Sequence, residues 1–278
     1  MLYRNFTGTI ALAAMLALAA GEACAFDESK YPDLKGVWHR IGAPRWHQQD
    51  RTYANAPLTP EYRAIYEQNV KDQQAGRQGT DPTYTCLSPG MPRIMNVYEP
   101  MEIVVTPQTT HILIEHIHDS RRIHTDGRPW PDEVDPSFRG YTIGQWEDTD
   151  GDGRYDTLVA ETRFMKGPRS FDSTGLPLHA DNKTVVKERI YLDKTNPNIL
   201  IDEITVIDNA LTRPWTIVRK YQRDGKPFPI WRESICAENN NHVAIGKEDY
   251  MISADGLLMP TRKDQPAPDL RYFPQTRK

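Results

Sequence analysis

The most constraining feature of this chain is a run of short β-type segments between residues 101 and 236, with no helical pattern between them. Each segment is rich in Val, Ile, Thr and aromatic residues, and turn residues separate it from the next. Strands joined by such short connections pair antiparallel, so we predict a sheet that closes into a barrel or packs as a sandwich. The predicted strands are 101–106, 110–117, 121–125, 141–147, 156–164, 184–192, 200–207, 215–223 and 231–236.

Residues in several of these segments alternate between two faces of the predicted sheet, as successive side chains of a strand do. The clearest case is 183–193, where Val185, Lys187, Arg189 and Tyr191 face away from Val186, Glu188, Ile190 and Leu192. One face of this strand is therefore predicted to lie against the core.

The two ends of the chain differ from this β-rich middle. A helix is predicted over 59–76, with Thr59 as its N-cap and Pro60 at the first helical position. A Pro-rich and Gly-rich connector follows over 83–100, and the Pro-rich stretch 260–278 is predicted to run over the surface as an extended tail. We expect residues 26–278 to form a single domain.

The first 25 residues have the pattern of a cleavable signal peptide. One positive charge, Arg4, precedes an apolar run over 10–20, and the run ends at the small-x-small sequence Ala23-Cys24-Ala25. The run has about half of the 20 apolar residues that a membrane span needs. A lipoprotein is the alternative, but Glu22 stands where a lipobox requires a small neutral residue. We therefore predict a periplasmic or secreted protein without a membrane span.

Composition excludes several classes of partner. The predicted signal peptide contains one Arg and one Glu, so its removal leaves the net charge at −4, which does not favour nucleic acid or an anionic membrane. The sequence has no Gly-rich phosphate loop, so we expect no nucleotide cofactor. It also lacks a Gly-x-Ser-x-Gly motif, so nothing supports a serine nucleophile. The oligomeric state is not indicated.

Two cysteines, Cys86 and Cys236, remain after the predicted cleavage. In an oxidising compartment two such residues pair, and the closed loop of about 150 residues then contributes roughly 4–5 kcal/mol. Two buried free thiols are the alternative. Neither cysteine has a CxxC partner, so a structural disulfide is favoured over a catalytic site.

An acidic stretch over 148–156 resembles the ligand spacing of an EF-hand calcium loop. The oxygen ligands of such a loop fall here on Asp148, Asp150, Asp152, the carbonyl group of Arg154, and Asp156. The glutamate of position 12 is missing, and Glu147 or Glu161 is the candidate to reach in from a neighbouring strand in its place. A polar hairpin tip is the alternative. We predict a structural Ca²⁺ ion of modest affinity.

The stretch 121–146 has an unusual density of ionisable residues. His124, Asp126 and Arg128 alternate, so an extended strand would present them on one face. We predict that His124 transfers a proton, that Asp126 orients it, and that Arg122 or Arg128 holds an anion. The alternative is an ordinary hairpin turn over 125–128 surrounded by surface charges.

Four further residues are candidates for the same site. Glu115 lies in an otherwise apolar strand, which is costly unless the carboxylate is paired or functional. His116 and His118 are two residues apart, a spacing that presents two imidazoles to a metal, with His124 or His179 as a third ligand. No carboxylate follows at a recognisable cupin spacing, so we favour substrate-binding roles for these histidines.

The triplet Gly36-Val37-Trp38 ahead of the strands is similar to the Gly-x-Trp signature of lipocalins. That resemblance implies a calycin-like barrel in which Trp38 is structural and packs against an arginine. The chain also resembles an uncharacterised family of secreted bacterial proteins over most of its mature length, with no implied activity. The matching stretches are 32–38, 86–93, 122–128, 143–147, 156–159, 213–215 and 236–239, and the acidic stretch 148–155 is an insertion relative to that family.

Together these features predict an exported β-barrel enzyme that binds a small hydrophobic or aromatic molecule in its lumen. We expect cofactor-free acid–base chemistry, in a lyase, an isomerase or a hydrolase, with Trp130, Trp146 and Trp215 as apolar walls. The rival is a non-catalytic periplasmic binding or transport protein with the same barrel. A structural module of the cell envelope, with an exposed apolar patch, is a third hypothesis.

Overall fold

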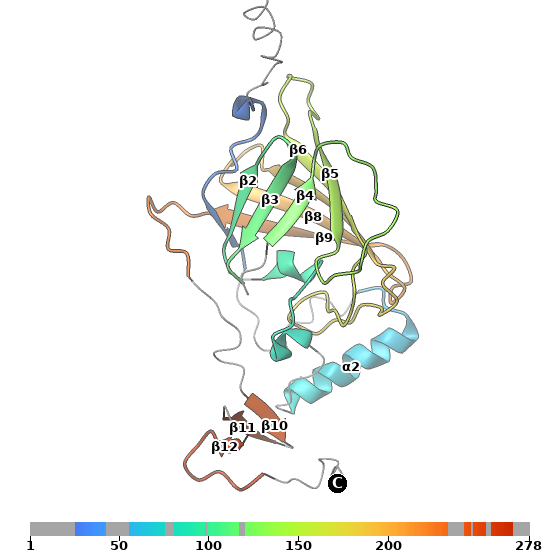
Figure 1. Cartoon of the computed structure of the whole chain (residues 1–278), viewed down its shortest axis with the longest axis vertical. Helices are drawn as coiled ribbons and strands as arrows, with labels where there is room; N and C mark the ends of the chain where they lie inside the picture. The colour runs from blue at the N-terminus through green and yellow to red at the C-terminus, as the bar shows by residue number, and fades with distance from the viewer. Residues whose placement is uncertain are drawn as a thin grey trace, which may run out of the picture.

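Nine strands close into a barrel in the computed structural model, in the order β1 to β9 (Figure 1). The structure describes residues 26–42, 56–75, 81–97, 99–116, 120–232, 242–245, 247–253 and 257–268. This architecture confirms the predicted mainly β, lipocalin-like barrel. The strands are β1 (Val37–Arg40), β2 (Met101–Val105), β3 (Thr109–Ile114), β4 (Ser120–His124), β5 (Tyr141–Glu147), β6 (Thr157–Arg163), β7 (Val185–Leu192), β8 (Ile199–Ile207) and β9 (Trp215–Arg223).

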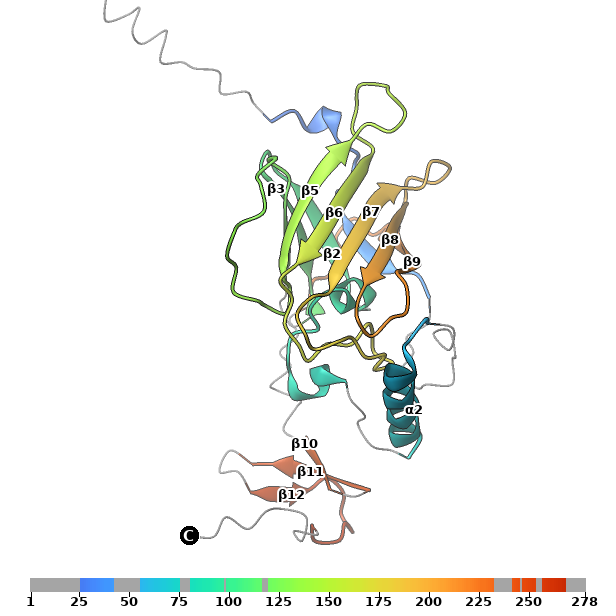
Figure 2. The ribbon, with the colours of Figure 1, turned by 90° about the vertical axis from the view of Figure 1, so that its right-hand side faces the viewer.

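Strands β2 to β9 correspond to the first eight predicted segments, and β1 pairs with both β2 and β9 to close the barrel. The expectation of a wholly antiparallel sheet is wrong at one place, because β4 and β5 pair in parallel. Parallel neighbours need a long connection. Residues 125–140 supply it and run along the outside of the barrel (Figure 2). The hairpin turn considered for 125–128 therefore does not form.

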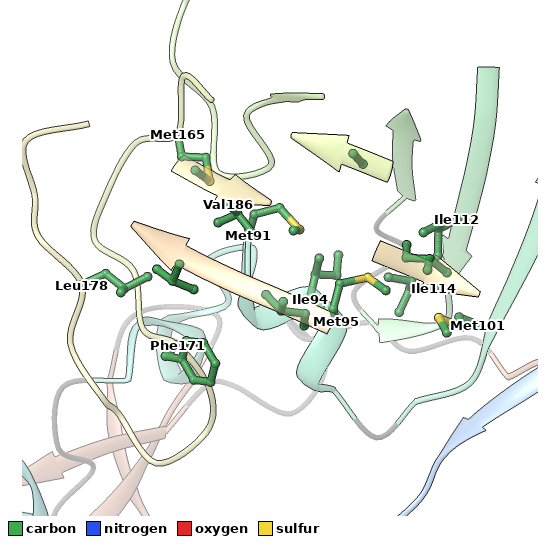
Figure 3. Packing of buried hydrophobic residues seen from close by; sticks show 14 of the residues in the cluster. Met91, Ile94, Met95, Met101, Ile112, Ile114, Met165, Phe171, Leu178 and Val186 are labelled. Carbon is green, nitrogen blue, oxygen red and sulfur yellow. The ribbon is translucent and has the colours of Figure 1, made fainter. Parts of the chain in front are cut away.

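The barrel interior is filled by apolar side chains of the strands and by a plug from the connector before β2. Met91, Ile94 and Met95, in and beside the short 3₁₀ helix η3 (Arg93–Asn96), are almost fully buried among the strands (Figure 3). Burial of each such side chain contributes about 1.5–3 kcal/mol. The connector thus packs into the core, a role that its Pro-rich and Gly-rich sequence did not indicate.

Trp38 of β1 is fully buried, and its indole Nε1 donates to the Leu34 carbonyl oxygen at 2.9 Å. The guanidinium carbon of Arg223 lies 4.3 Å from the centre of the indole ring. The structural role that the lipocalin resemblance implies for Trp38 is therefore confirmed, and it includes the arginine partner.

The predicted helix is present as α2 (Pro60–Gln74), which begins after the N-cap Thr59. Its buried face includes Tyr66 and Asn69, and the Asn69 amide donates to the Thr174 carbonyl oxygen at 2.9 Å. No helix in the described part of the chain is long and apolar enough to cross a membrane.

The C-terminal residues form a second, three-stranded antiparallel sheet that the sequence did not predict. Its strands are β10 (His242–Ile245), β11 (Glu248–Ile252) and β12 (Leu258–Pro260). Of the strand predicted over 231–236, Trp231 and Arg232 lie outside any strand, and 233–236 lie outside the described residues. The predicted tail begins at the end of β12 and is irregular as far as residue 268, where the description ends.

Candidate functional site

Strand β4 separates the ionisable residues of the stretch 121–146 onto two faces. Arg121 and Ile123 are buried and point into the barrel, whereas the intervening Arg122 is exposed and His124 is half-buried. Since successive strand residues point to opposite faces, Arg122 and His124 lie on the outer wall. The predicted position of His124 in the barrel lumen is therefore wrong.

Asp126 and Arg128, at the start of the 125–140 connection, hold each other in a bidentate ion pair. Arg128 Nε donates to Asp126 Oδ1 at 2.8 Å, and Nη2 donates to Oδ2 at 2.6 Å. These hydrogen bonds lower the pKa of Asp126 to about 2. The carboxylate is engaged by Arg128, so the predicted role of Asp126 in orienting His124 finds no support in this geometry.

The outer wall has an opening where β4 and β5 separate. Their parallel pairing covers two residue pairs, Ile123 with Thr142 and His124 with Ile143. Before these pairs, where the two strands begin, Arg139 Nη1 donates to the Ser120 carbonyl oxygen at 2.6 Å. This hydrogen bond links the start of β4 to the segment that leads into β5. A pocket of about 390 Å³ lies at this opening, and we call it the wall pocket. It is lined by Ser120, Arg121, Arg122, His124, Arg139, Gly140, Tyr141 and Thr142.

His124 is the titratable group whose environment in the wall pocket suits proton transfer. Burial lowers its pKa from 6.5, and the positive charge of Arg128 lowers it further. Asp126 opposes this shift, while Arg122 and His111 add to the lowering. The imidazole is therefore neutral at pH 7 and able to accept a proton. Its Nδ1 atom is buried and has no hydrogen-bond partner.

Aromatic side chains continue from the wall pocket along the outer surface. The Tyr141 ring centre lies 4.9 Å from that of His124 and 6.2 Å from that of Trp130. The ring centres of Trp130 and Phe164 are 6.1 Å apart, and the guanidinium carbon of Arg163 lies 4.4 Å from the Trp130 ring centre. Trp130 thus lies beside the wall pocket on the outside of the barrel, and not in the lumen where the sequence analysis had placed it.

The other two predicted wall residues, Trp146 and Trp215, lie elsewhere, so the three tryptophans do not enclose one ligand. Trp146, near the end of β5, donates to Thr110 Oγ1 at 3.1 Å. Trp215 begins β9 and packs 4.8 Å from Phe171. Because β5 and β9 run in the same direction around the barrel, these two side chains are near opposite ends of it.

Sequence reasoning missed a polar cluster inside the barrel. Arg121 donates through both terminal nitrogens to the Glu188 carboxylate, at 2.9 and 2.6 Å, and both side chains are almost fully buried. Asp202 of β8 is also fully buried, and neither of its carboxyl oxygens has a hydrogen-bond partner. The alternation along 183–193 could have indicated the buried glutamate, because Glu188 shares a face with the apolar residues Val186 and Ile190.

The environment of Asp202 disfavours the charged form of its carboxyl group. Burial raises its pKa well above 3.8, and the nearby negative charge of Glu188 raises it further. Arg121 and Arg219 act in the opposite direction but do not outweigh these effects. In the described part of the barrel interior, the buried Arg121–Glu188 ion pair therefore lies near a buried acid whose charged form is disfavoured.

Glu115 does not join His124, because it lines a different pocket of about 400 Å³. In that pocket His39 Nε2 lies 3.2 Å from Asp224 Oδ2. His116 Nδ1 is 2.8 Å from Glu99 Oε1, an ion-pair distance without hydrogen-bond alignment. The predicted catalytic role of Glu115 beside His124 is therefore wrong.

The remaining predicted histidines are also dispersed. His179 lies in the β6–β7 connection, where its ring stacks on Tyr62 at 5.3 Å and its Nδ1 is 3.2 Å from Asp181. His118 lies outside the described residues. His116 and His179 therefore contact different partners, and neither lines the wall pocket.

The acidic loop between β5 and β6 brings three of its predicted ligands together. Carboxylate oxygens of Asp148, Asp150 and Asp156 lie within 4.8 Å of one another, the single group of this kind among the described residues. Asp152 is outside this group and accepts from the backbone N–H of Arg154 at 2.8 Å.

Two features of this acidic loop bear on a bound ion. The Asp148 carboxylate already accepts from the N–H groups of Gly151 and Gly153, at 2.7 and 2.8 Å. The additional ligands considered, Glu147 and Glu161, pair instead with basic residues of β7. The loop thus offers three carboxylates, with no acid from a neighbouring strand.

Cys86 is disulfide-bonded. Its predicted partner Cys236 lies outside the described residues, as does the predicted signal peptide 1–25. No protein-family model matches the chain, and no curated protein is similar to it.

Proposed function

We propose that this protein is an exported enzyme that moves a proton on a small anionic molecule bound in the wall pocket. The observation that carries the proposal is a half-buried, neutral His124 in a pocket lined by arginine side chains. A base that is uncharged at neutral pH, next to cations that favour developing negative charge, is suited to proton abstraction beside a carboxylate. This replaces the lumen site with a site in the barrel wall.

Each role is assigned to a residue of the pocket. His124 accepts the proton. Arg122 is exposed at the rim and has no ion pair with another described residue, so its guanidinium is available to hold the substrate carboxylate. The aromatic surface of Tyr141 and Trp130 accommodates an apolar or aromatic substituent.

Hydrogen–deuterium exchange at carbon tests this function without knowledge of the final product. We expect the mature protein in D₂O to catalyse exchange of the α-proton of an aryl-substituted carboxylate such as 2-phenyl-3-methoxypropanoate, measured by NMR. The variant His124→Gln should lose this exchange by about 100- to 10,000-fold. His39→Gln, which alters a histidine of the other pocket, is the matched control and should retain it. Equal rates in all three proteins would exclude His124 as the base.

A non-catalytic binding protein is the second candidate, and one observation favours it. Arg128 occupies both oxygens of Asp126, so this carboxylate does not orient the His124 ring. In this alternative the pocket binds the carboxylate probe with an affinity that depends on Arg122, and the probe is recovered with its α-proton unexchanged.

We also propose that the acidic loop 148–156 binds a structural Ca²⁺ ion, supported by the closeness of its three carboxylates. Addition of Ca²⁺ should raise the melting temperature of the mature protein, and a chelator should reverse the change. The variant Asp148→Asn should abolish the response. Asp193→Asn, in the exposed β7–β8 turn, should leave it intact. A Ca²⁺ response that survives Asp148→Asn contradicts this site.

Export and the pairing of Cys86 with Cys236 remain part of the same proposal. The disulfide-bonded state of Cys86 supports an oxidising compartment outside the cytoplasm. Mass spectrometry of the purified native protein tests both, because it gives the N-terminal residue, expected near Phe26, and the peptide linked to Cys86.

A further inference from the structure

We infer that Tyr141 is a second catalytic residue of the wall pocket, and that the substrate is a carboxylate with an oxygen leaving group on its β-carbon. The reaction would be a β-elimination in which His124 takes the α-proton and Tyr141 protonates the departing oxygen. This inference rests on the proposed function of His124 and extends it to a reaction class.

The position of Tyr141 follows from the unusual parallel register. Ile123 is opposite Thr142, so the preceding residues, Arg122 of β4 and Tyr141 of β5, are neighbours across the opening. Both side chains point outward, as does that of His124. Three groups from two strands therefore surround one pocket: an anion holder, a base and a phenol.

Arg128 gives the phenol a charged partner. Its Nη1 donates to the Tyr141 hydroxyl oxygen at 3.4 Å, while the same guanidinium is fixed by Asp126. A hydroxyl that accepts a hydrogen bond from a cation keeps its own proton directed elsewhere, so the Tyr141 hydroxyl can donate that proton to a group bound in the pocket. In this scheme the Asp126–Arg128 pair positions the Tyr141 hydroxyl and does not touch the substrate.

The elimination is balanced by these groups alone. His124 removes the proton from the α-carbon, the pair of electrons from that C–H bond forms the C=C double bond, and the bond from the β-carbon to oxygen breaks. Tyr141 gives its proton to the leaving oxygen, which departs as an alcohol. The proton on His124 then returns to the Tyr141 phenolate through solvent, so no oxidant, reductant or co-reactant is needed.

The surroundings also indicate where the leaving group lies. The Tyr141 ring is 6.2 Å from Trp130, on the side of the pocket that continues towards Phe164. An apolar or aromatic group attached to the departing oxygen would contact Trp130 there. The carboxylate would lie at Arg122, so the substrate spans the pocket from its cationic side to its aromatic side.

The leaving group provides the test. An alkoxide must be protonated as it departs, whereas 4-nitrophenoxide leaves without a proton. With 2-phenyl-3-methoxypropanoate we expect Tyr141→Phe to reduce kcat for alkene formation by about 100- to 10,000-fold. With the corresponding 3-(4-nitrophenoxy) compound the same variant should stay close to the rate of the unaltered protein. Tyr155→Phe, at a tyrosine of the acidic loop, is the control and should behave normally with both compounds.

The outcomes separate this inference from the proposed function. His124-dependent α-proton exchange together with equal losses of Tyr141→Phe on both leaving groups would show that Tyr141 is structural, and would overturn the inference alone. Exchange without alkene formation would also overturn it while retaining the base. Absence of both exchange and elimination in the unaltered protein would overturn the two together. If Tyr141 were only structural, Tyr141→Phe would slow the reaction of both compounds. A near-normal rate with the 4-nitrophenoxide leaving group alone would therefore show that Tyr141 supplies the proton.

Discussion

Two residues of the barrel, His124 and Asp202, show how burial controls charge. His124 is half-buried on the outer wall, and burial disfavours its cationic form. Asp202 is fully buried inside the barrel, and burial disfavours its anionic form. Both groups are therefore neutral over a wider range of pH than in water, the histidine towards acid and the aspartate towards base. Each difference predicts a measurable pH dependence.

For His124 we expect α-proton exchange to depend on the neutral imidazole. Its pKa lies below 6.5, so the exchange rate should be full at pH 7 and decline only as the pH falls through the lowered value. Burial is the largest cause of the lowered His124 pKa, and the charge of Arg128 is the second largest. The variant Arg128→Gln removes this charge, so the midpoint of the pH dependence of exchange should move to higher pH. NMR titration of the His124 ring checks both. A midpoint above 6.5 in the unaltered protein contradicts the prediction.

For Asp202 we expect a cost in stability that grows with pH. The folded-state pKa is raised, so the stability associated with this group is fully present below 3.8 and is lost as the pH rises through the raised value. Asp202→Asn should therefore gain stability relative to the unaltered protein as the pH increases. Urea unfolding at several pH values measures this difference. The charges that face Asp202 are those of Glu188, Arg121, Arg219 and Glu203, so they should be left unchanged.

A comparison variant uses a buried residue of the same strand that carries no titratable group. Ile204→Val removes one methyl group from the core, so it should lower the stability by the same amount at every pH. A constant difference between Asp202→Asn and the unaltered protein across the whole pH range would mean that Asp202 is ionised in the fold.

At the scale of elements, the parallel pairing of β4 with β5 creates the wall pocket. Gly140 is essential to this arrangement, because the connection must enter β5 tightly against β6. It has φ of +68°, and an added Cβ would overlap the Arg163 carbonyl oxygen. Gly144 similarly lets Ile123 approach the β5 backbone, since its Cβ would lie 2.6 Å from Ile123 Cγ2. The close packing of the β5 backbone against β6 and against Ile123 of β4 thus determines the shape of the opening between β4 and β5.

Gly140→Ala should consequently destabilise the protein by about 2–5 kcal/mol, which combines left-handed strain with overpacking. Gly127→Ala is a matched control, because Gly127 has φ of +74° in the same connection but nothing within 4 Å of an added Cβ. The control should cost only about 1–2 kcal/mol. Chemical denaturation compares the two variants. Equal losses would show that the contact with β6 contributes nothing.

At the scale of the whole molecule, the barrel is stabilised by the closure of its nine-stranded sheet and by the disulfide at Cys86. β1 pairs with β9 and β2, so the nine strands leave no edge exposed. The connector that contains Cys86 continues into the plug of Met91, Ile94 and Met95. A disulfide at Cys86 therefore restrains the segment that fills one end of the barrel.

Removal of this disulfide should cost about 2–5 kcal/mol. If Cys86 pairs with Cys236, then Cys86→Ser, Cys236→Ser and the double variant should lose the same stability, because each breaks the same bond. Thermal unfolding without reductant measures the three losses. Additive losses in the double variant would show that the two cysteines have different partners.

The sequence alone determined eight of the nine barrel strands, the helix, and the alternation of buried and exposed side chains along the strands. β5 and β9 were predicted at their observed bounds, because local side-chain preference and alternation suffice to define such segments. The pattern also brought His124, Arg122 and Arg128 into one neighbourhood, and Trp38 into the core. These are properties of residues close together in the chain.

Only the tertiary structure decided which strands are neighbours and on which side of the wall the site lies. The parallel β4–β5 register, the plug and the Arg121–Glu188 pair all join residues far apart in sequence or depend on the path of a long connection. Local preference contains no information on such long-range contacts, because many registers satisfy the same alternation. The candidate site therefore lies in the barrel wall and not in the lumen. His124, Arg122 and Trp130 had been predicted from the sequence, whereas Tyr141 had not.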